Sequence, residues 1–161
     1  MKLSQLFTMQ QELDSFIQKN REGNEDVFKE KGLALLVELA ELANETRSFK
    51  FWSTKGPSET EVILEEYVDS IHFLLSLGIE KGFDRMSDWP EKEVHGDLTA
   101  LFLKTTESII RFMNELTLES YESMWIHYGA IAKSLGFTYE NIIDAYILKN
   151  DENYKRQKTG Y

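Results

Sequence analysis

Two of the most apolar segments of this chain each carry a pair of carboxylates three residues apart. Glu38 and Glu41 lie within GLALLVELAELANE, and Glu66 and Asp69 lie within VILEEYVDSIHFLLSLG. Residues three apart project from one face of an α-helix. A helix that is apolar almost all the way round is usually buried, and several buried carboxylates need cations beside them. The pattern therefore predicts two buried helices whose acidic faces meet around a cation.

The remaining segments predict an all-α fold, a bundle of about six helices in a single domain of residues 1–161. Apolar residues recur at helical spacing, and no segment alternates as a strand would. Residues 83–97 are expected to form a surface loop. From this spacing and from capping residues, we expect six helices. The first three span 3–19, a cap at Asn24 to about Arg47, and a Ser58–Glu61 capping box to about Gly82. The last three span a cap at Asp97 to about Leu116, 119–135, and Thr138 into the polar tail.

Composition excludes several classes of function. The net charge of −10 argues against a protein that binds nucleic acid through a basic surface. The absence of cysteine excludes disulfides, thiolate nucleophiles and cysteine zinc sites. The N-terminal residues are unlike a signal peptide, and no apolar run is long enough to cross a bilayer. We therefore expect a cytoplasmic protein with no nucleic-acid or membrane partner.

The ligand type favours Mg²⁺, with Mn²⁺ as a possible substitute, because both prefer oxygen ligands. A di-iron bundle would need two Glu-x-x-His pairs, and this chain offers only Asp69-x-x-His72. Mg²⁺ that is held by few protein ligands usually binds substrate phosphates as well, so phosphoryl or nucleotidyl chemistry is expected. The alternative is that the acids simply face solvent on amphipathic helices, which the apolar flanking residues disfavour.

Two further segments have either a structural or a functional interpretation. Residues 149–161 carry four basic and two acidic side chains, which makes them a solvated terminus or a basic phosphate-binding segment. The sequence FKFWSTK at 49–55 places aromatic side chains in a loop. It is either a plug for the core or one wall of a base pocket that includes Trp52, with Lys55 reaching a phosphate.

Together these motifs resemble the all-α nucleoside-triphosphate pyrophosphohydrolases and, within them, the dimeric dUTPases. The acidic pairs carry the broader resemblance. The narrower one spans nearly the whole chain and rests on Gln11-Glu-Leu-Asp14, FKFW at 49–52, the string from Asp69 to Ser76, and Lys149-Asn150, Asn153, Arg156-Gln157 and Gly160-Tyr161. The family often has Asn where this chain has Asp14.

The resemblance implies a homodimeric, Mg²⁺-dependent dUTP diphosphatase that releases dUMP and pyrophosphate, with dUDP as a candidate second substrate. It implies that Glu38, Glu41, Glu66 and Asp69 bind the metal and that Glu38 also activates the attacking water. The implied substrate-binding residues are Gln11, Asp14 and Trp52 at the uracil, Phe73 at the deoxyribose, and Lys55, Lys149, Asn153 and Arg156 at the phosphates. His72 either helps to position the nucleoside or is a core histidine beside an acid.

Two alternatives to this function stay open at the level of sequence. One is a MazG-like pyrophosphohydrolase that acts on a nucleotide with another base. The other is a helical interaction module that has no catalytic activity. Turnover of a panel of nucleotides separates all three.

Overall fold

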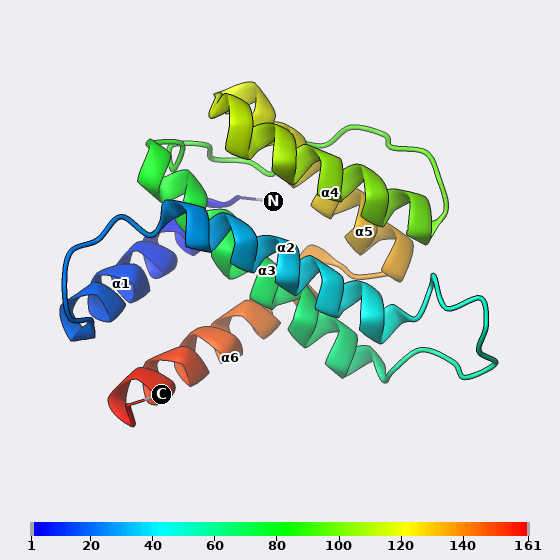
Figure 1. The fold of residues 1–161 in the computed structure, drawn as a ribbon, viewed down its shortest axis with the longest axis horizontal. Coiled ribbons are helices and arrows are strands. Elements are labelled where there is room, and N and C mark those ends of the chain that lie inside the picture. Colours follow the sequence, from blue (N-terminus) through cyan, green and yellow to red (C-terminus); the bar gives the residue numbers. More distant parts are fainter. Residues whose placement is uncertain (1, 161) are drawn as a thin grey trace.

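The fold is an all-α bundle, as the sequence predicted (Figure 1). The computed structural model describes residues 2–160, and within them the regular structure is helical apart from one isolated bridge between Lys2 and Asp88. Its six helices are α1 (Ser4–Asn20), α2 (Phe28–Thr46), α3 (Thr60–Lys81), α4 (Leu98–Glu115), α5 (Leu118–Leu135) and α6 (Tyr139–Lys158).

Three of the predicted helix ends agree with the capping geometry. The Asp97 carboxylate accepts a hydrogen bond from the backbone N–H of Ala100 at 2.9 Å, which starts α4. Thr138 and Asn141 form a reciprocal capping box at the start of α6. Gly136 follows α5 with a φ of +77°, a left-handed conformation that glycine adopts without strain.

Two predicted caps are wrong. Helix α2 begins at Phe28 rather than beside Asn24, and the Asp26 carboxylate accepts from the backbone N–H of Phe28 at 2.9 Å. Helix α3 begins at Thr60, and the hydroxyl of Ser58 donates to the Glu45 carboxylate instead of capping the helix. In the second case a long-range side-chain contact replaces the local one.

Helix α3 is the centre of the bundle. It packs against α2 on one side and against α1 and α6 on others, while α4 packs against α2 and α5. Buried residues lie all around α3, as its apolar sequence required. The Tyr121 hydroxyl of α5 donates to the Leu74 carbonyl of α3 at 2.7 Å, so these two helices are also held together by a buried hydrogen bond.

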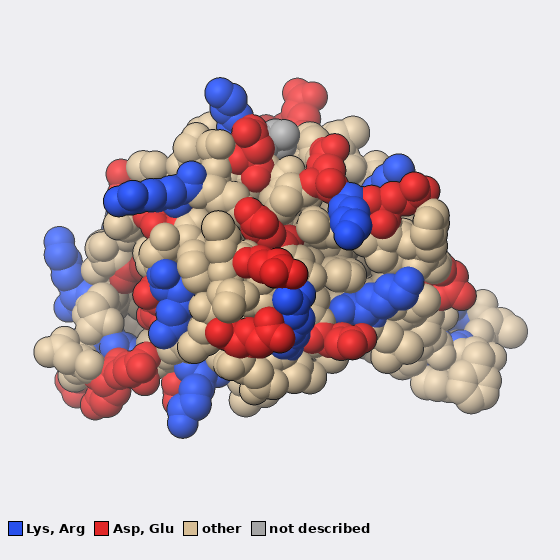
Figure 2. Space-filling view, turned by 90° about the horizontal axis from the view of Figure 1, so that it is seen from above, with Lys and Arg blue, Asp and Glu red and all other residues tan. Residues whose placement is uncertain are grey.

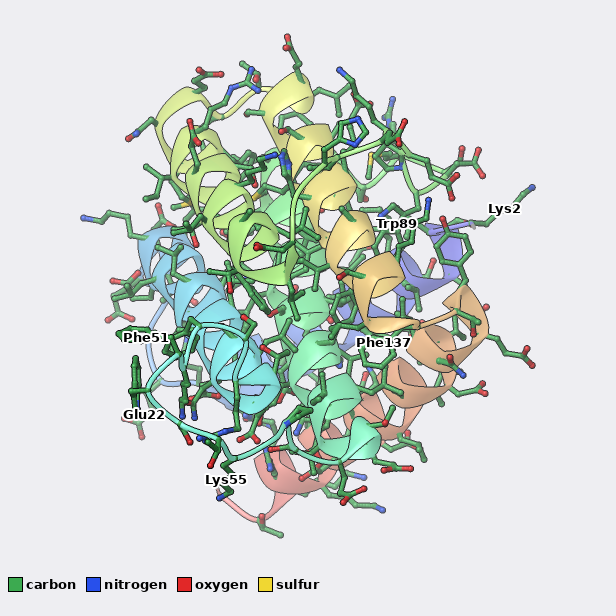
Figure 3. The ribbon with its side chains drawn as sticks, turned by 90° about the vertical axis from the view of Figure 1, so that its right-hand side faces the viewer. Lys2, Glu22, Phe51, Lys55, Trp89 and Phe137 are labelled. Carbon is green, nitrogen blue, oxygen red and sulfur yellow. The ribbon has the colours of Figure 1, made fainter. Side chains whose placement is uncertain are left out.

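The segment 83–97 is a loop, but one of its side chains belongs to the core. Trp89 is 3% exposed, its ring centroid lies 4.8 Å from that of Trp125, and its Nε1 donates to the Trp125 carbonyl at 2.8 Å (Figure 3). The loop therefore covers the outer face of α5 instead of lying freely on the surface.

The surface agrees with the charge expected from composition. On the face shown in Figure 2, acidic and basic side chains are interspersed, without a continuous basic stripe. None of the helices in the described part of the chain has the length and apolar character needed to cross a membrane.

Candidate functional site

A cavity of about 400 Å³ opens between α1, the first half of α2, the middle of α3 and the second half of α6. Helices α1 and α6 pack against each other and against α3, so residues from the first and last helices of the chain meet there (Figure 1). One wall of the cavity carries carboxylates from α2 and α3. Another carries basic side chains, and a third carries a network of buried polar groups.

Three of the four predicted metal ligands form a compact group. One carboxylate oxygen from each of Glu38, Glu66 and Asp69 lies within 4.8 Å of the others, so the group could hold a divalent cation. The Oε2 atoms of Glu38 and Glu66 are buried and have no hydrogen-bond partner among residues 2–160. Glu41 is exposed, but it lies close enough to interact with both glutamates. Buried acceptors without donors are the kind of ligand that a bound cation would satisfy.

The electrostatics of the group agree with this fit. Burial, and then the charges of Asp69 and Glu41, raise the pKa of Glu38 to about 8. The same causes raise the pKa of Glu66 to about 7. Burial raises the pKa of Asp69 to about 6 although the ammonium of Lys149 opposes the shift. The fold therefore brings together carboxylates whose pKa values are raised. A cation bound among them would lower those pKa values and favour the ionised forms.

The basic wall comes from one face of α6. Lys149 is 7% exposed, and its Nζ lies 2.9 Å from Glu65 Oε1 and 3.3 Å from Asp69 Oδ1. Burial opposes the charge of Lys149, but these two carboxylates outweigh it and raise its pKa. Asn153 and Arg156 follow one and two helical turns later, and both line the cavity. Cationic and amide donors thus face the carboxylates across the cavity.

The third wall is a chain of buried hydrogen bonds. The Oε1 of Gln10 accepts from the Tyr146 hydroxyl at 2.8 Å and lies 2.7 Å from His72 Nδ1. The Nε2 of Gln10 donates to Asp14 Oδ1 at 2.9 Å, and Ser76 Oγ donates to Asp14 Oδ2 at 2.7 Å. The rings of His72 and Tyr146 stack with centroids 4.2 Å apart. The network therefore connects α1, α3 and α6.

Burial sets the charge states of this wall. Burial, and then the charge of Lys149, lower the pKa of His72 to about 3, so the imidazole is neutral at physiological pH. Burial raises the pKa of Asp14, while the charge of Lys31 and the hydrogen bonds from Ser76 and Gln10 lower it. Gln10 therefore lies between a neutral imidazole, that of His72, and the carboxyl group of Asp14, whose pKa is raised.

Most of the predicted substrate-binding residues line this one cavity, but three do not. Those in the cavity are Asp14, His72, Phe73, Lys149, Asn153 and Arg156. Gln11 is exposed, and Gln10 occupies the cavity instead, because Gln10 lies on the face of α1 that carries Leu6 and Leu13 into the core. Trp52 is 65% exposed, and Lys55 is exposed in the same loop, outside the cavity lining. Figure 3 shows the neighbouring Phe51 and Lys55 projecting outward from the loop.

Five other polar lining residues were missed by sequence reasoning: Gln10, Gln18, Arg21, Lys31 and Ser76. Lys31 is seven residues before Glu38 and Ser76 is seven after Asp69, so helical spacing places each on the face of a predicted ligand. That signal was available in the sequence. Arg21 lies just beyond α1, and no periodicity points to it. Tyr161, part of the C-terminal motif, lies outside the described residues.

Comparison with known proteins adds an independent finding. The chain matches the model of the dUTPase family over residues 2–161, which is nearly its whole length. No curated protein sequence matches it. The family match covers all four helices that form the cavity, and the cavity is lined by acidic, basic and neutral polar side chains. The chain therefore belongs to the all-α dUTPase family and is a dUTP diphosphatase.

Proposed function

We propose that the chain hydrolyses dUTP to dUMP and pyrophosphate with Mg²⁺ held by Glu38, Glu41, Glu66 and Asp69. The observation that carries the metal site is a pair of buried Oε2 atoms, in a group of three carboxylates, that have no hydrogen-bond partner in the described part of the chain. Mg²⁺ prefers such oxygen ligands and retains positions for phosphate oxygens, and Mn²⁺ can substitute for it. dUDP is a further candidate substrate, since it has the same base and sugar.

The protein's own groups then have distinct roles at the α-phosphorus. The bound cation would neutralise charge that develops on the phosphate oxygens. Glu38, at the boundary between the carboxylate group and the cavity, orients the attacking water and accepts its proton. Lys149, Asn153 and Arg156 bind the phosphates through charge-assisted hydrogen bonds. Lys149 already pairs with Asp69 and Glu65 in the absence of a nucleotide. When a phosphate binds, the ammonium group would therefore interact with the phosphate and with these carboxylates together.

The nucleoside would occupy the polar end of the cavity. Phe73 lies between the carboxylates and Ser76 along α3 and lines the cavity. It would pack against the deoxyribose, where its ring would exclude a 2′-hydroxyl. Asp14 and Gln10 would contact the uracil, with Gln10 replacing the Gln11 expected from sequence. His72 supports this end of the cavity through Gln10.

The proposed assembly is a homodimer in the cytoplasm, with the nucleotide as the other partner and neither nucleic acid nor membrane required. Leu33 and Val37 of α2 and Leu103 and Ile110 of α4 are exposed apolar side chains on two helices that pack together. A second copy would cover such a face. A second copy would also explain why Trp52 lies outside the cavity of its own chain.

The test is turnover of purified chain with dUTP, dCTP, dTTP and UTP, with products separated by chromatography. In the presence of Mg²⁺ we expect dUTP to give dUMP and pyrophosphate, and excess chelator to abolish the reaction until Mg²⁺ is restored. Preference for another base would identify a pyrophosphohydrolase of different specificity. No turnover of any nucleotide would identify a binding module and overturn the proposal.

A further inference from the structure

We propose that Tyr146 is a positioning residue for base selection, because its hydroxyl fixes the orientation of the Gln10 amide at the base end of the cavity. The inference rests on the proposed function and deepens it. It concerns how this chain distinguishes uracil from cytosine, two bases of nearly the same size. Shape alone separates them poorly, so the discrimination has to come from hydrogen-bond donors and acceptors.

The orientation of the Gln10 amide follows from the groups around it. Asp14 accepts from both Gln10 and Ser76, so its carboxylate acts as an acceptor on both oxygens. The amide N–H of Gln10 must therefore face Asp14, which leaves Oε1 facing Tyr146 and His72. Both of those groups then donate, and His72 carries its proton on Nδ1.

Tyr146 is the member of this set that the fold holds most firmly. Its side chain is 0% exposed, and its ring stacks on His72 at an interplanar angle of 20°. Its hydroxyl is a donor at 2.8 Å from Gln10 Oε1. Rotating the amide would place two acceptors against each other at Asp14, and it would remove from the buried Tyr146 hydroxyl proton the acceptor that it has in Gln10 Oε1. A buried unpaired polar group costs about 1–3 kcal/mol, so Tyr146 stabilises one orientation.

One orientation of the amide gives the cavity a fixed pattern of hydrogen-bond donors and acceptors. The second N–H of Gln10 can donate to a carbonyl of the base, and the Asp14 carboxylate can accept an N–H. Uracil has an N–H at N3 beside its carbonyls, whereas cytosine has a lone pair at N3. Because the sugar and phosphates fix the register of the nucleoside, cytosine would direct that lone pair at Asp14. The pattern therefore favours uracil as long as the amide does not turn.

The substitution that tests this is Tyr146→Phe, which removes the hydroxyl and keeps the ring that stacks on His72. Tyr121→Phe is the matched control, because Tyr121 is also 0% exposed and donates to a buried carbonyl at 2.7 Å, yet it lies in α5 and its acceptor is Leu74 rather than Gln10. The ratio of kcat/KM for dUTP to that for dCTP is measured for both variants and wild type, together with melting temperatures and the binding of dUMP and dCMP by calorimetry.

We expect Tyr146→Phe to lower the dUTP-to-dCTP ratio by about tenfold, the effect of losing one buried hydrogen bond. The change should appear in KM for dUTP and in dUMP affinity, with kcat nearly retained, since the metal and phosphate groups are untouched. Tyr121→Phe should lose stability and keep the ratio. An unchanged ratio in Tyr146→Phe, or an equal fall in Tyr121→Phe, would overturn the positioning role while leaving dUTP hydrolysis intact. A wild type that cleaves neither nucleotide would overturn both proposals.

Discussion

At the scale of single residues, the site places carboxylates whose ionisation is opposed by burial beside a lysine whose positive charge those carboxylates favour. Glu38 is the acid most affected: its pKa is about 8, and its Oε2 has no partner in the described residues. On the other side, Lys149 is held between Glu65 and Asp69. Without a cation, the carboxylates are both desolvated and close to one another, which disfavours their ionised forms. Binding of a cation would offset this cost.

Glu38→Gln should remove most activity and leave the fold intact, because it removes a charge and a proton acceptor with little change in volume. We expect kcat for dUTP to fall by at least about a hundredfold, the usual contribution of a general base. The matched control is Glu30→Gln, an exposed glutamate in the first turn of the same helix, which should keep wild-type activity. Circular dichroism would check the fold. Near-wild-type turnover by Glu38→Gln would exclude Glu38 from the reaction.

The raised pKa values also predict how metal-free stability depends on pH. Glu38 and Glu66 have pKa values of about 8 and about 7, above their ordinary value of 4.5. The folded chain therefore binds protons that the unfolded chain releases, so this stability is full at low pH and is lost as pH rises through the folded pKa values. In chelator, the melting temperature should fall between pH 6 and pH 8.5.

Two controls isolate the carboxylates from other titrating groups. Mg²⁺ should reduce the loss of melting temperature at pH 8.5, because a bound cation favours the ionised carboxylates. Glu38→Gln should reduce it without metal, since the amide does not titrate. If wild type and Glu38→Gln show the same dependence on pH, the acidic group does not control stability in this range.

At the scale of helices and loops, the sequence could predict what depends on local spacing and could not predict what depends on packing. The helices at Asp97 and Thr138 begin where expected because their caps are local hydrogen bonds. The predicted cap at Ser58 does not form, because the Ser58 hydroxyl donates to the carboxylate of Glu45, thirteen residues away. Trp89 enters the core through contacts with α5 that no period in residues 83–97 reports.

The candidate site shows the same division. Spacing along α2 and α3 was enough to predict that Glu38, Glu66 and Asp69 gather, since each pair shares a helix face. Spacing along α1 also places Gln10, rather than Gln11, on the face of Leu6 and Leu13, but it could not show that the Tyr146 hydroxyl of α6 would bond to Gln10.

The packing of α3 against α5 gives a prediction at this scale. A Cβ at Gly78 would overlap the Tyr121 hydroxyl, which is buried and bonded to Leu74. Gly78→Ala should therefore destabilise the chain by about 1–3 kcal/mol, the usual cost of overpacking. Gly56→Ala is the control, since nothing lies within 4 Å of its added Cβ. Urea unfolding gives both values, and equal stabilities would show that α3 and α5 can separate freely.

At the scale of the whole molecule, the aromatic loop and the cavity lie apart within one chain. Phe51 is 92% exposed and Trp52 65% exposed, while the cavity is formed by α1, α2, α3 and α6. Large exposed aromatic side chains are unfavourable in water unless another surface covers them. If Trp52 contacts a base, as the sequence motif suggests, the base therefore belongs to the cavity of a second copy.

Subunit mixing tests this arrangement directly. In a shared site, Glu38 of one copy would act with Trp52 of the other. Glu38→Gln and Trp52→Ala homodimers should then each be impaired, the first in kcat and the second in KM for dUTP. After unfolding and refolding together, a mixed dimer would have one site with both substitutions and one site with neither. Activity should therefore rise above the mean of the two separately refolded variants.

The two possible locations of Trp52 predict opposite outcomes of this mixing. If Trp52 serves the cavity of its own chain, every site in the mixture still carries one substitution, and activity stays at the mean of the two variants. Refolding Glu38→Gln with Glu30→Gln controls for mixing itself, because that mixture should give only the mean of its components. Sedimentation velocity on the same samples should show dimers throughout, and a monomeric wild type would exclude a shared site. Recovery that exceeds the mean in the first mixture alone is thus the signature of a site built from two chains.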